Sequence, residues 1–284
     1  MSWQVWLGAA VLVALVLGIA ARWLWVRRAA RRPRVHRPPR LRHPIVLAHG
    51  ILGFDEVKLA GRRQEYFRGI PDQLRKLGTE VYVLKVPALG SVEARAQALA
   101  SAVRSLPAER VNIIAHSMGG LDARFAISQL GLAAKVASLT TVGTPHHGTP
   151  LADIGTRVLG DGLMLKRVLA RLGVDVEAFY DLTTARMNRF NDAVPNHLKV
   201  AYGSYVASVP GAPRLNPLLL PAHLYLRQRA GDNDGLVPTQ SQRWGELLGR
   251  VEADHWAQIG WSAGRFDVSD FYARVVRELI GRGF

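Results

Sequence analysis

The stretch VNIIAHSMGG places a serine at the end of an apolar run. Its residues Ala115-His116-Ser117-Met118-Gly119 have the small-x-Ser-x-Gly spacing of a nucleophile elbow, in which a strand turns sharply into a helix. The bend strains the serine backbone and requires small side chains two positions to either side, which Ala115 and Gly119 provide. We therefore predict that Ser117 is a nucleophile, at a helix N-terminus that favours developing negative charge.

A serine nucleophile needs a general base, and the base needs an acidic group that orients it. In sheets of this kind the chain order is Ser, then Asp or Glu, then His. Of the nine histidines, only His255 follows the acidic turn GDNDGLVP, which contains Asp232 and Asp234. We predict that Asp234 orients His255 and that His255 takes the Ser117 proton. Asp232 is the competing acid, and a buried histidine packed on Trp256 is the structural alternative.

The tetrahedral intermediate of acyl transfer needs two backbone N–H donors. Met118, directly after the nucleophile, would supply one of them. The segment His49-Gly50-Ile51 follows the first apolar run, so Ile51 would supply the other, with Gly50 allowing a close approach. A plain glycine turn is the alternative interpretation of this segment.

Apolar runs alternate with helical patterns along the chain, and this alternation predicts an α/β fold with a mostly parallel, doubly wound sheet. Ligands bind at the carboxyl ends of the strands in such sheets, and the candidate residues follow those ends. Strands are expected at residues 45–48, 80–86, 111–115, 137–142 and 247–251, with weaker candidates at 198–205 and 224–231; helices are expected at 62–77, 92–106, 118–130 and 268–280.

The composition fits a globular protein with a core, because 49% of the 284 residues are apolar and 21% are charged. The absence of cysteine excludes disulfides, thiolate metal sites and a cysteine nucleophile. The net charge of +15 is concentrated near the N-terminus, where nine arginines fall within residues 22–42 and no acidic residue precedes Asp55. A nucleic-acid partner is therefore not predicted, since it would need basic residues spread over a folded face.

Residues 1–26 are expected to form one N-terminal transmembrane helix. The segment has no charged side chain apart from Arg22, is long enough to span about 30 Å of hydrocarbon, and carries tryptophans near both ends. A cleaved signal peptide and a buried core helix are the alternatives. The basic linker 27–43 would lie on anionic headgroups. The expected location is a bacterial inner membrane, where the positive-inside rule favours a cytoplasmic domain at 44–284.

Four motifs in order give the chain a family resemblance: PIVLAHGILGFDEV, AHSMGG, VGTPHHGT, and NDGLVP followed by DHW. Over residues 44–265 the chain resembles the bacterial triacylglycerol lipases of the α/β-hydrolase fold. The resemblance implies Ser117 as nucleophile, Asp234 as acid, His255 as base, and Ile51 and Met118 as oxyanion donors. These are the roles that the residues themselves predict.

The chain also departs from these lipases. Many of them bind calcium through side chains two and six residues after the catalytic histidine, where this chain has Ala257 and Trp261, so no metal site is expected there. The pair His146-His147 is interpreted as a loop feature. The insert at about 149–195 corresponds to a lid; the apolar stripe Leu165, Val168, Leu169 and Leu172 fits either a mobile lid, hinged near Gly160–Gly162, or a fixed cap.

The sequence thus predicts a membrane-anchored serine hydrolase that cleaves carboxylic esters of lipids through an acyl-enzyme, without a cofactor. A phospholipase or lipid acyltransferase could use the same triad. The alternative from another class is a catalytically silent membrane scaffold on a hydrolase fold, since a fold alone does not establish a function.

Overall fold

The computed structural model describes residues 41–51, 57–59, 62–161, 177–211, 214–262 and 266–284. Six strands in this part of the chain form one parallel sheet in the order β4-β1-β5-β6-β7-β8, and a short antiparallel hairpin, β2-β3, lies apart from it. The strands are β1 (Ile45–Ala48), β2 (Val57–Leu59), β3 (Arg62–Gln64), β4 (Val81–Leu84), β5 (Val111–His116), β6 (Val136–Val142), β7 (Ala201–Ser208) and β8 (Glu246–Glu252).

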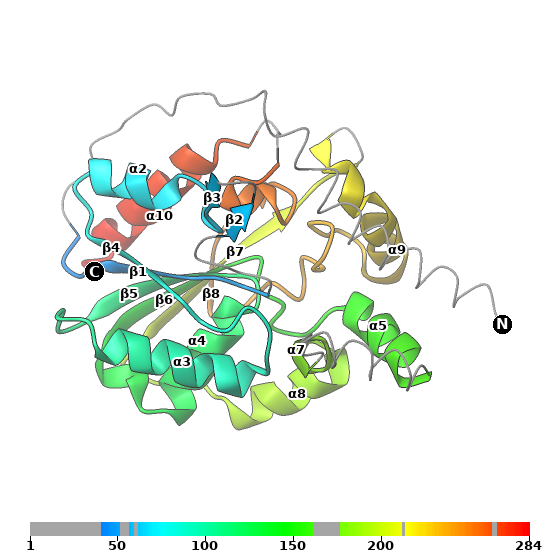
Figure 1. The fold of residues 1–284 in the computed structure, drawn as a ribbon, viewed down its shortest axis with the longest axis horizontal. Coiled ribbons are helices and arrows are strands. Elements are labelled where there is room, and N and C mark those ends of the chain that lie inside the picture. The colour runs from blue at the N-terminus through cyan, green and yellow to red at the C-terminus, as the bar shows by residue number, and fades with distance from the viewer. Residues whose placement is uncertain (1–40, 52–56, 60–61, 162–176, 212–213, 263–265) are drawn as a thin grey trace.

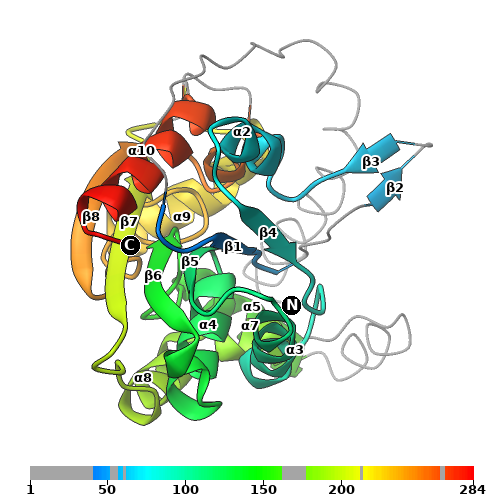
Figure 2. The same cartoon turned by 90° about the vertical axis from the view of Figure 1, so that its left-hand side faces the viewer.

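Helices cover both faces of the sheet, as Figures 1 and 2 show. Alternate residues of β1 enter two separate apolar clusters: Ile45 and Leu47 pack with α2 (Ile70–Lys76) and α10 (Val268–Gly281), whereas Val46 and Ala48 pack on the opposite face. That face is covered by α3 (Val92–Arg104) and α4 (Gly119–Gln129). Burial of each large aliphatic side chain contributes about 1.5–3 kcal/mol, so the two cores together fix the sheet that carries the candidate residues.

The remaining helices lie beyond the carboxyl ends of the strands, on the right of Figure 1. The Asp153 carboxylate accepts hydrogen bonds from Thr184 N (2.9 Å) and Thr184 Oγ1 (2.9 Å), which joins the first insert helix to a later one. The apolar stripe and Gly162 predicted for the insert lie outside the described residues, and Gly160 lies within α5. The helices beyond the strand ends are α5 (Pro150–Asp161), α7 (Glu177–Asp181), α8 (Thr184–Ala193) and α9 (Leu220–Ala230). Short 3₁₀ turns occur elsewhere along the chain at η2 (Leu132–Ala134), η4 (Pro217–Leu219) and η5 (Ala257–Ile259).

Most of the strands and helices expected from the sequence are present, but the strand expected at 224–231 is wrong. This stretch belongs to α9, which buries Ala222 and Leu226 at helical spacing and leaves Leu224 57% exposed. Pro221 fits the first turn of that helix. The helix expected at 62–77 is also too long: its first residues form β3, and α2 begins only after Gly69, whose φ is 69°.

None of the helices in the described ranges is long and apolar enough to cross a membrane. The predicted anchor at residues 1–26 and nearly all of the predicted linker at 27–43 lie outside those ranges. The structure therefore describes the domain that begins at about residue 44.

Candidate active site

Ser117 directly follows β5 in a strained backbone conformation. Its φ is 56°, the only positive φ of a non-glycine residue in the described part of the chain. Two interactions hold this geometry: Ser117 N donates to Val142 O (3.0 Å), and Thr144 Oγ1 donates to Ser117 O (2.7 Å). Strain of this kind concentrates at functional sites, and here it leaves the serine only partly buried at the top of the sheet.

Two glycines, Gly119 at the start of α4 and Gly50 in the loop after β1, allow the segments around Ser117 to pack closely. A Cβ atom at Gly119 would lie 2.6 Å from Ala48 O, so only glycine lets α4 start this close to β1. A Cβ atom at Gly50 would lie 2.6 Å from Ser117 Cβ and 3.0 Å from Ser117 Oγ. The loop after β1 thus touches the candidate nucleophile.

Asp234 lies against His255, with both side chains buried. Asp234 Oδ2 accepts hydrogen bonds from His255 Nδ1 (2.7 Å) and Gln258 Nε2 (2.9 Å), and Oδ1 accepts from the backbone of Leu236 (3.0 Å) and Val237 (2.8 Å). Because all four partners donate, the group is bound as a carboxylate with every strong acceptor direction used. It can therefore fix the ring orientation of His255 and leave Nε2 as the acceptor.

The competing acid, Asp232, points elsewhere. Its side chain is 72% exposed and lies 3.7 Å from Arg227. It is Asp234 that shares a buried contact with His255. The Asp234 loop follows α9, and it reaches the sheet because Val209, just after β7, donates to Asn233 O (3.1 Å).

His255 is held in a rigid turn by its neighbour Asp254. One oxygen of Asp254 accepts from Trp256 N (2.9 Å), Ala257 N (2.8 Å) and the Ser262 hydroxyl (2.8 Å). The backbone N–H of His255 in turn donates to the backbone oxygen of Asp234 (2.8 Å). The turn therefore sets the position of the imidazole before any substrate binds.

His255 and the nucleophile lie on adjoining turns. The imidazole rings of His255 and His116, the residue before Ser117, are 4.5 Å apart. The described contacts include no hydrogen bond between Ser117 Oγ and His255. In hydrolases without substrate this contact is commonly long, and it shortens in the Michaelis complex.

His116 is a buried, neutral neighbour of the site. The Tyr66 hydroxyl lies 2.7 Å from His116 Nδ1 and accepts a hydrogen bond from Gly50 N (3.1 Å). Burial, and the proximity of His255, hold the pKa of His116 well below its usual value, while the backbone of His255 and the side chain of Gln258 act weakly in the opposite direction. His116 thus links the loop after β1 to the turn of His255.

The two candidate oxyanion donors belong to the same apolar cluster: Met118 is one of its buried members, and the partly buried Ile51 packs against it. Met118 immediately precedes α4, so its N–H is among the amides at the helix start that have no partner inside the helix. His49 stabilises the other loop: its Nδ1 lies 2.9 Å from Gly50 O, and its Nε2 accepts from Val86 N (3.3 Å). The loop after β1 and the start of α4, which carry the two predicted donors, therefore lie next to each other.

The sequence did not single out the buried ion pair beneath this loop. Arg95 Nε donates to Asp122 Oδ2 (2.9 Å), and another guanidinium nitrogen donates to His49 O (2.7 Å). Both side chains are buried, and burial raises the pKa of Asp122 to about 7. Tyr66 and Gln258 were missed for the same reason as this pair, because they act through long-range contacts that no local spacing reveals. Asp254 was also missed, although it acts on its own turn.

His146, the first residue of the histidine pair at 146–147, packs between β6 and α4. His146 Nε2 lies 3.1 Å from Thr141 Oγ1, and Nδ1 lies 3.3 Å from Arg124. The Arg124 guanidinium also stacks on the Trp244 ring at 3.3 Å and donates to the carbonyl oxygen of Val194. Within the described ranges, no three His, Cys, Asp or Glu side chains come together as a possible metal site.

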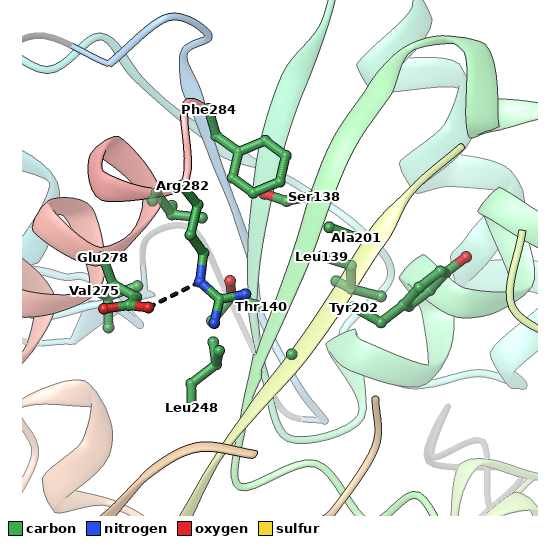
Figure 3. Close-up of a pocket in the computed structure, with 12 residues that line it drawn as sticks. Ser138, Leu139, Thr140, Ala201, Tyr202, Leu248, Val275, Glu278, Arg282 and Phe284 are labelled. Atoms are coloured by element: carbon green, nitrogen blue, oxygen red, sulfur yellow. Dashed lines mark hydrogen bonds and ion pairs between the residues drawn. The ribbon is translucent and has the colours of Figure 1, made fainter. Parts of the chain in front are cut away.

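A small cavity lies at the opposite end of the sheet. Figure 3 shows it between α10, the middle of β6 and the first residues of β7, where Arg282 pairs with Glu278. Its volume of about 10 Å³ would hold no more than one water molecule. It contains none of the candidate residues, so it belongs to the packing of the C-terminal helix.

Comparisons with known proteins identify the family of the chain. A PGAP1-like alpha/beta domain family matches residues 92–159. Triacylglycerol lipase 2 from Saccharomyces cerevisiae is 30% identical, over 89% of this chain and 95% of that protein. The chain belongs to the triacylglycerol lipase family. A triacylglycerol lipase from Vibrio cholerae is 35% identical, over 61% of this chain and 54% of its own length.

Solved structures agree on the fold of this lipase-family chain. The mature form of a lipase from Bacillus licheniformis superimposes with a TM-score of 0.68 at 24% identity, over 87% of this chain and 96% of that one. The parallel sheet is that of an α/β hydrolase, and the protein is a carboxylic ester hydrolase. The resemblance to lipases that the motifs indicated is confirmed.

Proposed function

We propose that this hydrolase cleaves acylglycerols or similar lipid esters with Ser117 as nucleophile, His255 as general base and Asp234 as the orienting acid. The observation that carries the proposal is the short, buried contact between Asp234 and His255 on the turn next to the strained serine. The backbone N–H groups of Ile51 and Met118 are the proposed oxyanion donors.

In the acylation step, Ser117 Oγ attacks the ester carbonyl carbon while its proton passes to His255 Nε2. The carbonyl oxygen becomes an oxyanion, and each backbone donor is worth about 10²–10³-fold in kcat. The intermediate collapses by breaking the bond between the carbonyl carbon and the alcohol oxygen. The leaving alcohol takes the proton from His255, and the acyl group remains on the serine.

In the deacylation step, a water molecule gives a proton to His255 and attacks the acyl carbon. The second intermediate collapses by breaking the bond between Ser117 Oγ and carbon, and the serine regains its proton from the imidazolium. The fatty acid is released. Asp234 keeps its four hydrogen-bond donors throughout and orients the ring of His255, so that the imidazolium faces a fully hydrogen-bonded acid group.

The proposal includes a membrane tether at residues 1–26 and the basic linker that follows. An apolar 21-residue start without a charged side chain, followed by nine arginines, supports it. A tethered domain meets lipid substrate at a raised effective concentration. By the positive-inside rule, the proposed location of the domain is the cytoplasmic face of the inner membrane.

The test uses the full-length protein in detergent micelles, with butanoyl, octanoyl and hexadecanoyl esters as substrates. Hydrolysis that rises with acyl length, is abolished in Ser117→Ala and is blocked by a fluorophosphonate attached to Ser117 is the expected result. Turnover confined to the butanoyl ester contradicts the lipid preference. A fully active Ser117→Ala variant contradicts the mechanism.

Two further measurements separate the remaining alternatives. Product analysis with an added alcohol distinguishes hydrolysis from acyl transfer, since a transferase forms a new ester in place of free fatty acid. Washing membranes that contain the full-length protein with alkaline carbonate tests the tether. Release of the protein into the wash contradicts an inserted helix.

A further inference from the structure

The side chain of Gln258 touches the same carboxylate oxygen that orients His255. Gln258 lies in η5, three residues after His255, and has no solvent exposure. Its Nε2 donates to Asp234 Oδ2 at 2.9 Å, beside the 2.7 Å contact from His255 Nδ1. This oxygen therefore has two donors, and only one of them belongs to the proposed general base.

We propose that Gln258 is a positioning residue: its amide, seated against Gly143, holds the Asp234 carboxylate in the orientation that aligns His255. The inference rests on the proposed function of the triad. It adds a fourth side chain to the site, together with the glycine that makes room for it.

Gly143 forms the seat for this amide at the end of β6. Its φ is 60°, and a Cβ atom there would lie 2.2 Å from Gln258 Oε1 and 3.2 Å from Asp234 Oδ2. Any side chain at this position would push the amide away from the carboxylate. The packing of the site thus requires glycine at position 143, in the Gly-Thr-Pro motif.

The surroundings also fix which way the amide points. Both oxygens of Asp234 only accept, so the NH₂ group must face them and Oε1 must face away. The Tyr66 hydroxyl accepts from Gly50 N and, because burial raises the pKa of Tyr66, keeps its proton to donate to His116 Nδ1. The hydrogen of neutral His116 is then on Nε2.

His116 Nε2 and Gln258 Oε1 complement each other as donor and acceptor. Each is buried and has no hydrogen-bond partner in the described part of the chain, yet Gln258 raises the pKa of His116 against the larger effect of burial. The two atoms form no hydrogen bond to each other in the structure, so the contact of Gln258 that carries the inference is the one to Asp234.

The second donor also affects the charge that His255 meets. The titratable groups that face His255 are Asp234 at Nδ1 and the ring of His116. Without the Gln258 amide, Asp234 Oδ2 would keep only the hydrogen bond from His255 Nδ1. The carboxylate would then stabilise the protonated imidazole more strongly. The acid limb of the pH–rate profile would then move to higher pH.

The test compares Gln258→Met with Asn112→Leu in the full-length protein. Asn112 is a matched control: its side-chain amide is also fully buried and hydrogen-bonded, but at the amino end of β5. For Gln258→Met we expect kcat to fall about tenfold, with KM within about twofold. The acid limb of the pH–rate profile should shift to higher pH. Asn112→Leu should lower the melting temperature and leave kcat per folded molecule and the pH profile unchanged.

A double-mutant cycle provides an independent measurement and carries the test if Gln258→Met does not fold. Gly143→Ala should lower kcat strongly when Gln258 is present and at least about threefold less in the Gln258→Ala background, because the clash with the amide is gone. Equal effects in both backgrounds, or wild-type kcat and pH profile in Gln258→Met, overturn the inference. An inactive Ser117→Ala measured alongside shows that the proposed triad itself stands; an active one overturns the triad instead.

Discussion

Replacing Asp234 with asparagine tests the orientation of His255 with almost no change in shape. The carboxylate accepts four hydrogen bonds and donates none, so the new NH₂ group must face a donor whichever way the amide turns. The backbone N–H groups of Leu236 and Val237 are fixed in the turn. The amide oxygen must therefore face them, and the amide nitrogen must face His255 Nδ1 and the Gln258 side chain.

This arrangement changes the tautomer of the His255 imidazole. To avoid two opposed N–H groups, His255 must move its hydrogen to Nε2, where it can no longer accept the Ser117 proton. Locking a catalytic histidine in the wrong tautomer costs on the order of 10⁴-fold in kcat, equivalent to about 5.5 kcal/mol of transition-state stabilisation. We expect kcat of Asp234→Asn to fall by that order, with KM little changed.

The assay is steady-state hydrolysis of a nitrophenyl octanoate, combined with the rate of fluorophosphonate attachment to the serine. Asp232→Asn is the control, because its carboxylate is 72% exposed and lies on the far side of the turn. It should keep wild-type kcat. Folded Asp234→Asn protein with kcat within tenfold of wild type would refute the assignment of the acid.

Three other changes probe the scaffold of the site. Gly50→Ala should lower kcat by about 10²-fold, because its Cβ atom would lie 2.6 Å from Ser117 Cβ and displace the oxyanion loop; an unchanged kcat with intact melting temperature contradicts this contact. Tyr66→Phe leaves Gly50 N without its acceptor and should reduce the free energy of unfolding by about 1–3 kcal/mol, measured in urea; no loss would mean that the hydroxyl is dispensable. Burial raises the pKa of Asp122 to about 7, so the folded state binds this proton more tightly than the unfolded chain, and the contribution to stability is present below about pH 4 and lost as pH rises through 7. Urea unfolding from pH 4 to 8 should show that loss, on the order of 3 kcal/mol, in wild type and not in Asp122→Asn; parallel curves would contradict the raised pKa beside Arg95.

The sequence predicted the parts of this protein that depend on local pattern. Continuous apolar runs predicted strands β1, β5 and β6, because a strand that is buried on both faces has no polar alternation. The elbow at Ser117 was also readable, since small neighbours at fixed spacing are a local steric requirement of the turn. The helix α9 was mistaken for a strand because a short apolar run has no decisive period.

The supporting residues could not be predicted in this way, because their roles arise from contacts between distant segments. Gln258 and Asp254 are close to His255 in sequence, yet nothing in DHWAQ says which carboxylate or amide each side chain meets. Tyr66 reaches His116 across 50 residues, and Arg95 reaches His49 across 46. Such pairings are set by the order of strands in the sheet, which sequence spacing does not contain.

Two buried carboxylates show why these supporting contacts decide chemistry. Asp234 and Asp122 are equally inaccessible, and each has a cationic or cationisable partner. Every strong acceptor direction of Asp234 meets a donor, whereas Asp122 Oδ1 has no partner among the described residues and burial raises the pKa of that group to about 7. Donors at both oxygens hold the Asp234 side chain in one orientation beside the general base, whereas at Asp122 the single cation Arg95 does not offset the effect of burial on the pKa. By this reasoning the turn that supplies Leu236 N and Val237 N is as necessary to the proposed triad as Asp234 itself.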